Sequence, residues 1–275
     1  MIFVATAHFH VADWIEIQHD YLKRHLTEPF RVYGSLEGID DSYRSFFDVL
    51  VPSFGEHAGK LNLLAEFILE EANPDDLIMF LDGDAFPVAD VMAKVGPLLE
   101  SNELVAVQRL ENFGDRQPHP CFCVVPVRTW MAIRGDWSSG HPMRPGRTDV
   151  GCNLLYGLES RGLPWAPLLR SQSLVIEQDL LFAIYGDLVY HHGAGVRGIK
   201  PKGQSRTEWT VEVPVTDMME KRVEKFAKNH PERFERMMAK ALEAAVVGEE
   251  IRQQVLDDPD FFASFLPEER PAAST

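Results

Sequence analysis

The chain has 275 residues, 45% of them hydrophobic, which is enough apolar material for one large domain or for a domain with an appendage. Its formal net charge of −15 argues against a nucleic-acid partner, because phosphate backbones are bound by a basic surface. No apolar run approaches the ~20 residues of a transmembrane segment, and three cysteines without CxxC spacing indicate a protein of the reducing cytoplasm, with neither a disulfide framework nor a zinc site.

Short apolar runs alternate with segments of helical periodicity through the first two thirds of the chain. The runs that we expect to be strands are 2–7, 30–36, 46–52, 77–81, 104–110 and 121–127. They are rich in Val, Ile, Leu and Phe, as in strands that are covered on both faces. The apolar positions that predict two helices between them are Val11, Trp14, Ile15 and Leu22, and then Leu61, Leu64, Ala65 and Ile68. This order predicts an α/β fold with a Rossmann-like, mixed but mostly parallel sheet flanked by helices.

The last sixty or so residues change in character. A helical stripe from Phe234 to Ala245 predicts a C-terminal helical appendage over 211–266, and NHP at 229–231 predicts a break between two helices. The appendage would cap the core of residues 1–210 or pack on a partner subunit in a homo-oligomer. Residues 267–275 are expected to form a disordered tail.

Asp82 and Asp84 directly follow the apolar run 77–81. Ligands of parallel α/β sheets bind at the carboxyl ends of the strands, and Gly83 between the aspartates allows a tight turn. Two carboxylates in that position suit Mn²⁺ or Mg²⁺ carrying a diphosphate. The alternative is an ordinary Asp-Gly turn at the surface.

Three further segments favour a site over a turn. The segment 187–202 predicts a strand that ends in His191 and His192 and continues into a glycine-rich basic loop with Arg197 and Lys200. A histidine there would complete a metal shell, and the cations would meet a diphosphate. Glu177 and Asp179 lie beside an apolar run and would accept a proton from an attacking hydroxyl, or else only cap a helix.

The third segment, 57–64, places Lys60 and Asn62 near the start of a helix. There they would meet a nucleotide, or would only form the polar side of an amphipathic helix.

An apolar strand ending in Asp82-Gly83-Asp84, then a carboxylate motif, then a strand ending in histidine resembles the GT-A-type glycosyltransferases over roughly residues 1 to 205. IEQD (176–179) is similar to the Asp-Gln-Asp element of retaining members such as glycogenin and also to the Glu-Asp motif of inverting members. The resemblance therefore implies a GT-A-like fold and leaves the stereochemical outcome open.

The resemblance also implies roles for single residues. Asp84 would bind the metal, and Asp82 would contact the metal or the donor's ribose. A glycogenin-like His-x-x-Gly pattern followed by Lys-Pro fits His192 with a two-residue insertion, so His192 is favoured over His191 as the third ligand.

Two further segments receive roles from the same resemblance. The first strand end, with Ala5 and Thr6, would meet the nucleotide base. The segment 148–158 is similar to an acceptor-side element, which would place Asp149, Gly151 and Asn153 near the sugar.

The implied function is metal-dependent transfer of a sugar from a nucleotide-diphosphate donor, UDP favoured over GDP, to an unidentified acceptor hydroxyl. In an inverting enzyme Asp179 would be the base, with Glu177 second. In a retaining enzyme both would stabilise an oxocarbenium-like centre.

Two alternatives to this function remain. One is a nucleotide-sugar-binding or carbohydrate-binding protein that keeps the metal site without turnover. The other is a haloacid-dehalogenase-type phosphatase, disfavoured because the aspartates follow the fourth expected strand rather than the first, and Ala85-Phe86 departs from its DxDx[TV] motif.

Overall fold

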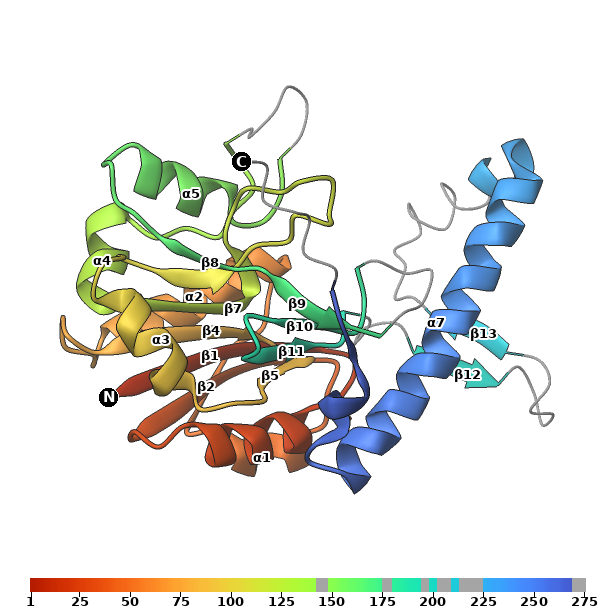
Figure 1. Ribbon diagram of the computed structural model, residues 1–275, viewed down its shortest axis with the longest axis horizontal. Helices are drawn as coiled ribbons and strands as arrows, with labels where there is room; N and C mark the ends of the chain where they lie inside the picture. The colour runs from red at the N-terminus through yellow and green to blue at the C-terminus, as the bar shows by residue number, and fades with distance from the viewer. Residues whose placement is uncertain (142–147, 175–179, 194–197, 202–208, 213–224, 269–275) are drawn as a thin grey trace.

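The computed structural model describes residues 1–141, 148–174, 180–193, 198–201, 209–212 and 225–268. Within these residues a seven-stranded sheet has the order β3-β2-β1-β4-β7-β6-β8 (Figure 1). Its strands are β1 (Ile2–Phe9), β2 (Phe30–Glu37), β3 (Val49–Val51), β4 (Leu77–Asp82), β6 (Val105–Val107), β7 (His119–Pro126) and β8 (Ala166–Leu168). All six runs expected to be strands are strands of this sheet, which confirms the predicted mixed α/β fold.

Strand direction decides which residues meet at the functional edge of the sheet, by which we mean the edge at the carboxyl ends of β1 and β4, next to Asp82. Strands β1 to β4 are parallel, β6 is parallel to β8, and β7 is antiparallel to both of its neighbours, β4 and β6. Because β7 runs the other way, its first residues lie at the same edge as the last residues of β4 and β6. Polar residues from both kinds of strand end can therefore share one site.

The sheet is covered on both faces, as its apolar strands predict. In β4, Met79 and Leu81 enter one core cluster, whereas Ile78 and Phe80 enter another. The first cluster is closed by α1 (Ile15–His25), α3 (Val91–Leu99) and part of a second sheet, and the other by α2 (His57–Leu69), α4 (Val127–Ile133) and α5 (Cys152–Glu159). Both helices predicted in this region, now α1 and α2, are confirmed.

A second, antiparallel sheet lies beside the functional edge, in the order β14-β9-β10-β11-β5. Its strands are β5 (Ala85–Pro87), β9 (Arg170–Ser173), β10 (Ala183–Tyr185), β11 (Val189–His191) and β14 (Leu266–Pro267). The predicted strand over 187–192 belongs to this sheet and not to the parallel one. It pairs with β5, the strand that directly follows the two aspartates.

The C-terminal region is mainly one long helix, α7 (Pro231–Asp257), which lies next to the hairpin of β12 (Gly198–Pro201) and β13 (Trp209–Glu212) (Figure 1). Residues 225–229 are helical and end before His230, so the predicted break is confirmed. Ile251 and Val255 of α7 join a third core cluster with Trp14 and Tyr190. The second half of α7 thus packs directly on residues of α1 and β11. None of the helices in the described ranges is long and apolar enough to cross a membrane.

We expect Ile251→Ala to lower the free energy of unfolding by about 2–5 kcal/mol, because this side chain is 2% exposed and its removal leaves a cavity. Leu256→Ala, at a position on the same helix that is 53% exposed, should change it little. Urea unfolding of the two variants measures the difference. Equal effects would mean that α7 does not belong to the core.

Candidate functional site

The two aspartates leave the main sheet at the end of β4. Asp82 is the last residue of that strand and β5 begins at Ala85, so Gly83 and Asp84 form the turn between them. A Cβ atom at position 83 would lie 2.7 Å from the carbonyl oxygen of Ala7, closer than side chains approach a backbone. Glycine at this position lets the turn lie against the end of β1.

Gln18 of α1 fixes this turn. Its Nε2 donates hydrogen bonds of 2.8 Å to the carbonyl oxygens of both Asp82 and Ala85. The side chain is 2% exposed, and a buried amide without partners would cost free energy. The two bonds therefore hold the backbone on both sides of Gly83 in one position relative to α1.

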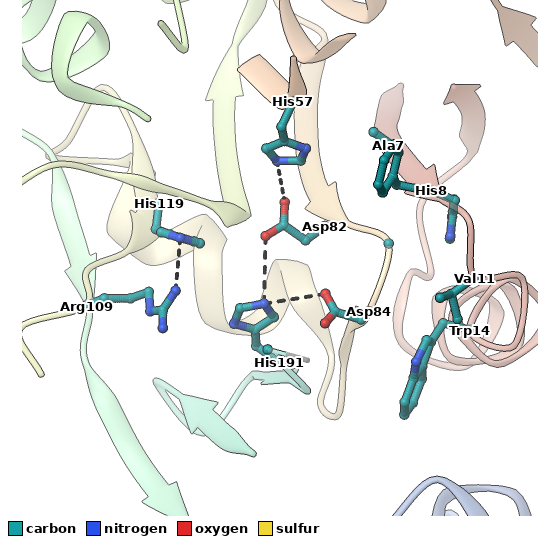
Figure 2. A pocket seen from close by; sticks show the side chains of 13 residues that line it. Ala7, His8, Val11, Trp14, His57, Asp82, Asp84, Arg109, His119 and His191 are labelled. Atoms are coloured by element: carbon teal, nitrogen blue, oxygen red, sulfur yellow. Dashed lines mark hydrogen bonds and ion pairs between the residues drawn. The ribbon is translucent and has the colours of Figure 1, made fainter. Parts of the chain in front are cut away.

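His191 reaches the aspartates because β11 pairs with β5. The register places His191 opposite Ala85, and the backbone N–H of His192 donates to the carbonyl oxygen of Asp84 at 3.0 Å. Nε2 of His191 lies 3.4 Å from Oδ1 of Asp84 and 3.7 Å from Oδ2 of Asp82 (Figure 2). One possible ligand atom from each of these three side chains lies within 4.8 Å of the others.

The preference for His192 as the third ligand is corrected by this geometry. Successive residues of a strand point to opposite faces, and His192 points into the third core cluster. Its Nδ1 lies 2.9 Å from the Tyr190 hydroxyl, and its ring packs against Trp14 and Phe182 at centroid distances of 4.4 and 4.8 Å. Burial lowers the pKa of His192 to about 4, as expected for a neutral residue of the core.

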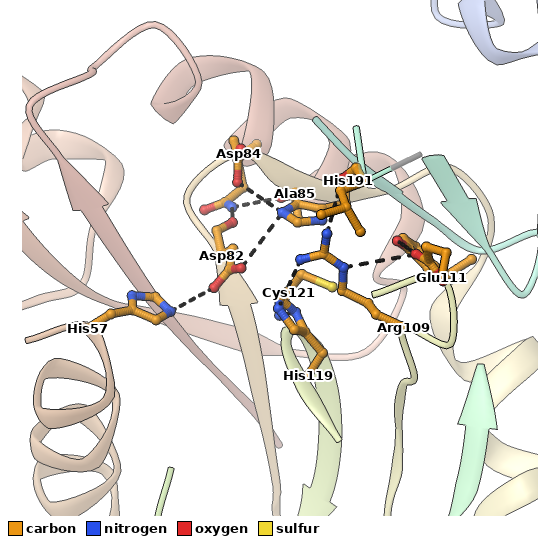
Figure 3. Close-up of polar contacts among 12 residues, drawn as sticks. His57, Asp82, Asp84, Ala85, Arg109, Glu111, His119, Cys121 and His191 are labelled. Atoms are coloured by element: carbon orange, nitrogen blue, oxygen red, sulfur yellow. Dashed lines mark hydrogen bonds and ion pairs between the residues drawn. The ribbon is translucent and has the colours of Figure 1, made fainter. Parts of the chain in front are cut away.

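His57, the first residue of α2, supports Asp82 from the other side. Its Nε2 lies 3.0 Å from Oδ1 of Asp82, the carboxylate oxygen that His191 does not face (Figure 3). Desolvation opposes protonation of His57, but the Asp82 carboxylate outweighs it and raises the pKa of the imidazole. Desolvation likewise opposes ionisation of Asp82, yet His57 and its neighbouring imidazoles lower the pKa of this carboxyl. The pair fixes the orientation of Asp82.

Arg109 and His119 form another wall of the site. Arg109 follows β6 and His119 opens β7, so the antiparallel direction of β7 brings them together. Nη1 of Arg109 lies 3.2 Å from Nε2 of His119, and Nη2 donates to the carbonyl oxygen of Leu180 at 3.1 Å (Figure 3). Burial and the nearby guanidinium lower the pKa of His119 well below its usual value, so its ring is neutral.

These side chains surround a pocket of about 300 Å³ at the carboxyl edge of the sheet (Figure 2). His8, at the end of β1, also lines it, and burial lowers the pKa of His8 to about 4. The described lining consists of Ala7, His8, Phe9, Val11, Trp14, His57, Asp82, Gly83, Asp84, Arg109, His119, His191 and Gly193.

The structure places the predicted nucleotide contacts differently. Ala5 and Thr6 are completely buried inside β1, which continues to Phe9, so the end of the strand lies further along than the sequence suggested. Lys60 lies outside the pocket lining: its Nζ is 2.6 Å from Oε2 of Glu37 and stands over the ring of Phe9. The end of β1 thus presents Ala7, His8 and Phe9 to the pocket instead.

Asn62 and Asn153 are structural rather than pocket residues. Both donate 2.7 Å hydrogen bonds to the carboxylate of Asp136, and Asn62 also accepts from the backbone N–H of Trp137. Gly151 has φ of +88°, and its N–H donates to the Trp137 carbonyl oxygen.

Asp149 also lies outside the pocket lining, and its carboxylate accepts a hydrogen bond from the backbone N–H of Val150. The segment predicted to bind an acceptor therefore holds the loop around residue 137 against α2 and α5.

Four predicted residues cannot be placed. Glu177, Asp179 and Arg197 lie outside the described residues. Lys200 belongs to β12, but its side chain is likewise outside the described part.

The sequence prediction did not include Gln18, His57, Arg109 or His119. Each is a single polar residue without a motif around it. The signal that would have found Arg109 and His119 is their position at strand ends, since 104–110 and 121–127 were expected strands. His57 stands at the start of the helix in which Lys60 and Asn62 were chosen instead.

The residues at the edge fit a divalent cation. Two carboxylates that face the same imidazole repel each other, and a cation between them would remove that cost. The donor set of two carboxylate oxygens and one imidazole nitrogen suits Mn²⁺ and also permits Mg²⁺. Asp82, Asp84 and His191 are thus a candidate metal site whose metal identity the donor set leaves open.

Comparison with known proteins gives matches at the level of fold. No protein-family model matches the sequence, and a search of curated proteins finds no match. The solved structures that are similar include the mannosyltransferase PcManGT from Pyrobaculum calidifontis, in complex with GDP-Man and Mn²⁺, at 12% identity and a TM-score of 0.44. They also include the glycosyltransferase GlyE of Streptococcus pneumoniae, at 14% identity and a TM-score of 0.39. A third is glucosyl-3-phosphoglycerate synthase from Mycobacterium tuberculosis, at 15% identity and a TM-score of 0.42.

These matches cover part of each protein. The alignment with PcManGT covers 60% of this chain and 54% of the mannosyltransferase, that with GlyE 61% and 44%, and that with the synthase 62% and 69%. The three proteins named here are glycosyltransferases by their descriptions. With identities of 12 to 15% and TM-scores below 0.5, the likeness does not assign an activity to this chain.

We expect His191→Ala to weaken Mn²⁺ binding by at least roughly ten- to hundred-fold, the loss typical even of residues that only support a metal ligand. His192→Ala should lower the melting temperature of the metal-free protein, because it empties a buried site, and should change Mn²⁺ affinity less. Calorimetric titration with Mn²⁺ and thermal melting separate the two effects. The opposite order of metal affinities would restore His192 as the ligand.

Gln18→Leu should weaken Mn²⁺ binding by roughly ten-fold or more, because the carbonyl groups on both sides of the turn lose their common donor. The matched control is Gln253→Leu, at an exposed position of α7 whose amide donates to the Asp257 carboxylate one turn along the same helix. Mn²⁺ affinity is measured by titration, and a melting curve without metal reports any loss of stability separately. Unchanged affinity in a folded Gln18→Leu variant would show that the turn holds its shape without this amide.

Proposed function

We propose that the chain is a metal-dependent glycosyltransferase that moves a sugar from a nucleotide-diphosphate sugar to an acceptor hydroxyl. The convergence of Asp82, Asp84 and His191 at the carboxyl edge of the sheet carries this proposal. Mn²⁺ is the favoured metal and UDP the favoured nucleotide. A divalent cation bound there would neutralise the charge that develops on the departing diphosphate.

The side chains of the site have distinct tasks in this proposal. Asp82, Asp84 and His191 hold the cation, His57 orients Asp82, and Gln18 sets the turn. Asp82 is held by His57 of α2, the turn by Gln18 of α1, and His191 by the pairing of β11 with β5. Such preorganised groups lower the free energy of reorganisation during the reaction.

The nucleotide is assigned to the flank of β4 on which β1 lies. There the pocket is lined by Ala7, His8 and Phe9, and by Trp14, the residue directly before α1. Neutral His8 offers a hydrogen bond without adding charge, and the apolar side chains offer a surface for a base or ribose. Arg197 and Lys200 remain the proposed contacts of the diphosphate, and Asp179, then Glu177, the proposed base of an inverting reaction.

Thermal shift with UDP and GDP, each with Mn²⁺ and with EDTA, tests the donor site. Ligand at ~100 times its dissociation constant adds about 2.7 kcal/mol of stability, which is roughly 5–10 °C for a domain near this size. We expect a shift that requires both Mn²⁺ and one of the nucleotides. Asp84→Asn should abolish it, whereas Asp75→Asn, whose carboxylate is 93% exposed, should not.

Release of nucleotide diphosphate from the matching sugar conjugate then separates an enzyme from a binding protein. Slow metal-dependent hydrolysis that is lost in Asp84→Asn supports transfer chemistry. Metal-dependent binding without any release would favour the non-catalytic alternative. Normal nucleotide binding by a folded Asp84→Asn variant would refute the site itself.

A further inference from the structure

Arg109 is a buried cation in the wall of the pocket. The residue follows β6, its side chain is 13% exposed, and it lines the cavity on the flank of β4 opposite to β1 (Figure 2). In a chain of net charge −15, an arginine held inside a pocket calls for a specific cause.

The contacts of this guanidinium are mostly neutral. Within the described part of the chain, its hydrogen bonds are with the imidazole of His119 and the carbonyl oxygen of Leu180. The Glu111 carboxylate stands 3.9 Å from Nε and already accepts a 2.6 Å hydrogen bond from the Tyr185 hydroxyl. Nε of Arg109 is buried without a hydrogen-bond partner among the described residues. Burying a guanidinium without a closely bonded carboxylate is costly.

A loaded metal site changes the charge balance of the pocket. The described lining contains two carboxylates, Asp82 and Asp84, and one arginine. A divalent cation on the two carboxylates would match their charges. Arg109 would then stand in the pocket wall with the Glu111 carboxylate, 3.9 Å from its Nε, as the nearby charge of opposite sign. An anionic ligand group would match the charge of Arg109, and the planar guanidinium is suited to phosphate or carboxylate oxygens.

The position of Arg109 separates this group from the donor. In the proposed function the nucleotide lies on the β1 flank of β4, whereas Arg109 lies beyond β7 on the opposite flank. A neutral sugar acceptor would leave the guanidinium with the Glu111 carboxylate at 3.9 Å, beyond hydrogen-bond distance, and with no closely bonded anion among the described residues. Resting on the proposed function, we propose that the acceptor carries an anionic group, phosphate or carboxylate, which Arg109 binds on the β6–β7 side of the pocket.

The test uses inorganic phosphate and acetate as probes, added to the full chain saturated with Mn²⁺ and the nucleotide diphosphate that binds it. Occupation of the metal by the nucleotide prevents the probes from binding the metal directly. We expect one of the anions to raise the melting temperature further in the wild type. Arg109→Gln should weaken the binding of that anion roughly ten- to hundred-fold, the range for a hydrogen bond to a charged group. Arg109→Lys should weaken its binding less.

The matched control is Arg116→Gln, on the same β6–β7 connection, whose side chain is 62% exposed and paired with Glu159. It should bind the anion as the wild type does. The inference is overturned if neither anion binds the wild-type complex. It is also overturned if Arg109→Gln weakens nucleotide binding as much as anion binding, because Arg109 would then contact the donor. If the wild type binds neither Mn²⁺ nor nucleotide, the proposed function is overturned, and this inference with it. If nucleotide binds in a metal-dependent way but no anion has an effect, this inference alone is overturned.

Discussion

The pairing of β11 with β5 is the contact on which the site depends. It is short, three residues on each strand, but it brings together chain segments that are about a hundred residues apart. One face of this pairing presents His191 to the aspartates, and the other presents His192 and Tyr190 to an aromatic core that α7 covers. The position of the imidazole in the pocket is thereby set by the packing behind it, and rigid support of this kind is what a metal site requires.

The site is also a case of buried polar groups compensating one another. Gln18 satisfies two carbonyl groups, His57 faces one oxygen of Asp82 and His191 the other, and Arg109 meets His119. Each partner comes from a different element, so the side chains of the pocket are oriented by tertiary structure rather than by their own loop. Burial lowers the pKa of His8, and burial together with the Arg109 guanidinium lowers that of His119, so neither imidazole adds a positive charge to the pocket.

Much of the fold, and part of the site, could be predicted from the sequence. The apolar run 77–81 marks a central strand by composition alone, and the strand-end rule then places Asp82 and Asp84 at the functional edge. The choice between His191 and His192 could not be made, because a shift of one residue in register exchanges the two faces of a strand. The cluster that Asn62 and Asn153 form with Asp136, outside the pocket lining, could not be foreseen because Asp136 is distant in sequence from Asn62. Arg109 and His119 meet only because β7 runs antiparallel, and composition does not report strand direction.

The antiparallel direction of β7 has a consequence for how such a protein can diversify. The metal side of the pocket is set by β4, β5 and β11, whereas Arg109 and His119 lie at the two ends of the β6–β7 connection. Insertions or substitutions in that connection would alter the wall that holds Arg109 while leaving the candidate metal ligands Asp82, Asp84 and His191 in place. If the proposed function holds, paralogues built on this scaffold would exchange acceptors while retaining their donor, with the evolutionary change confined to one surface connection.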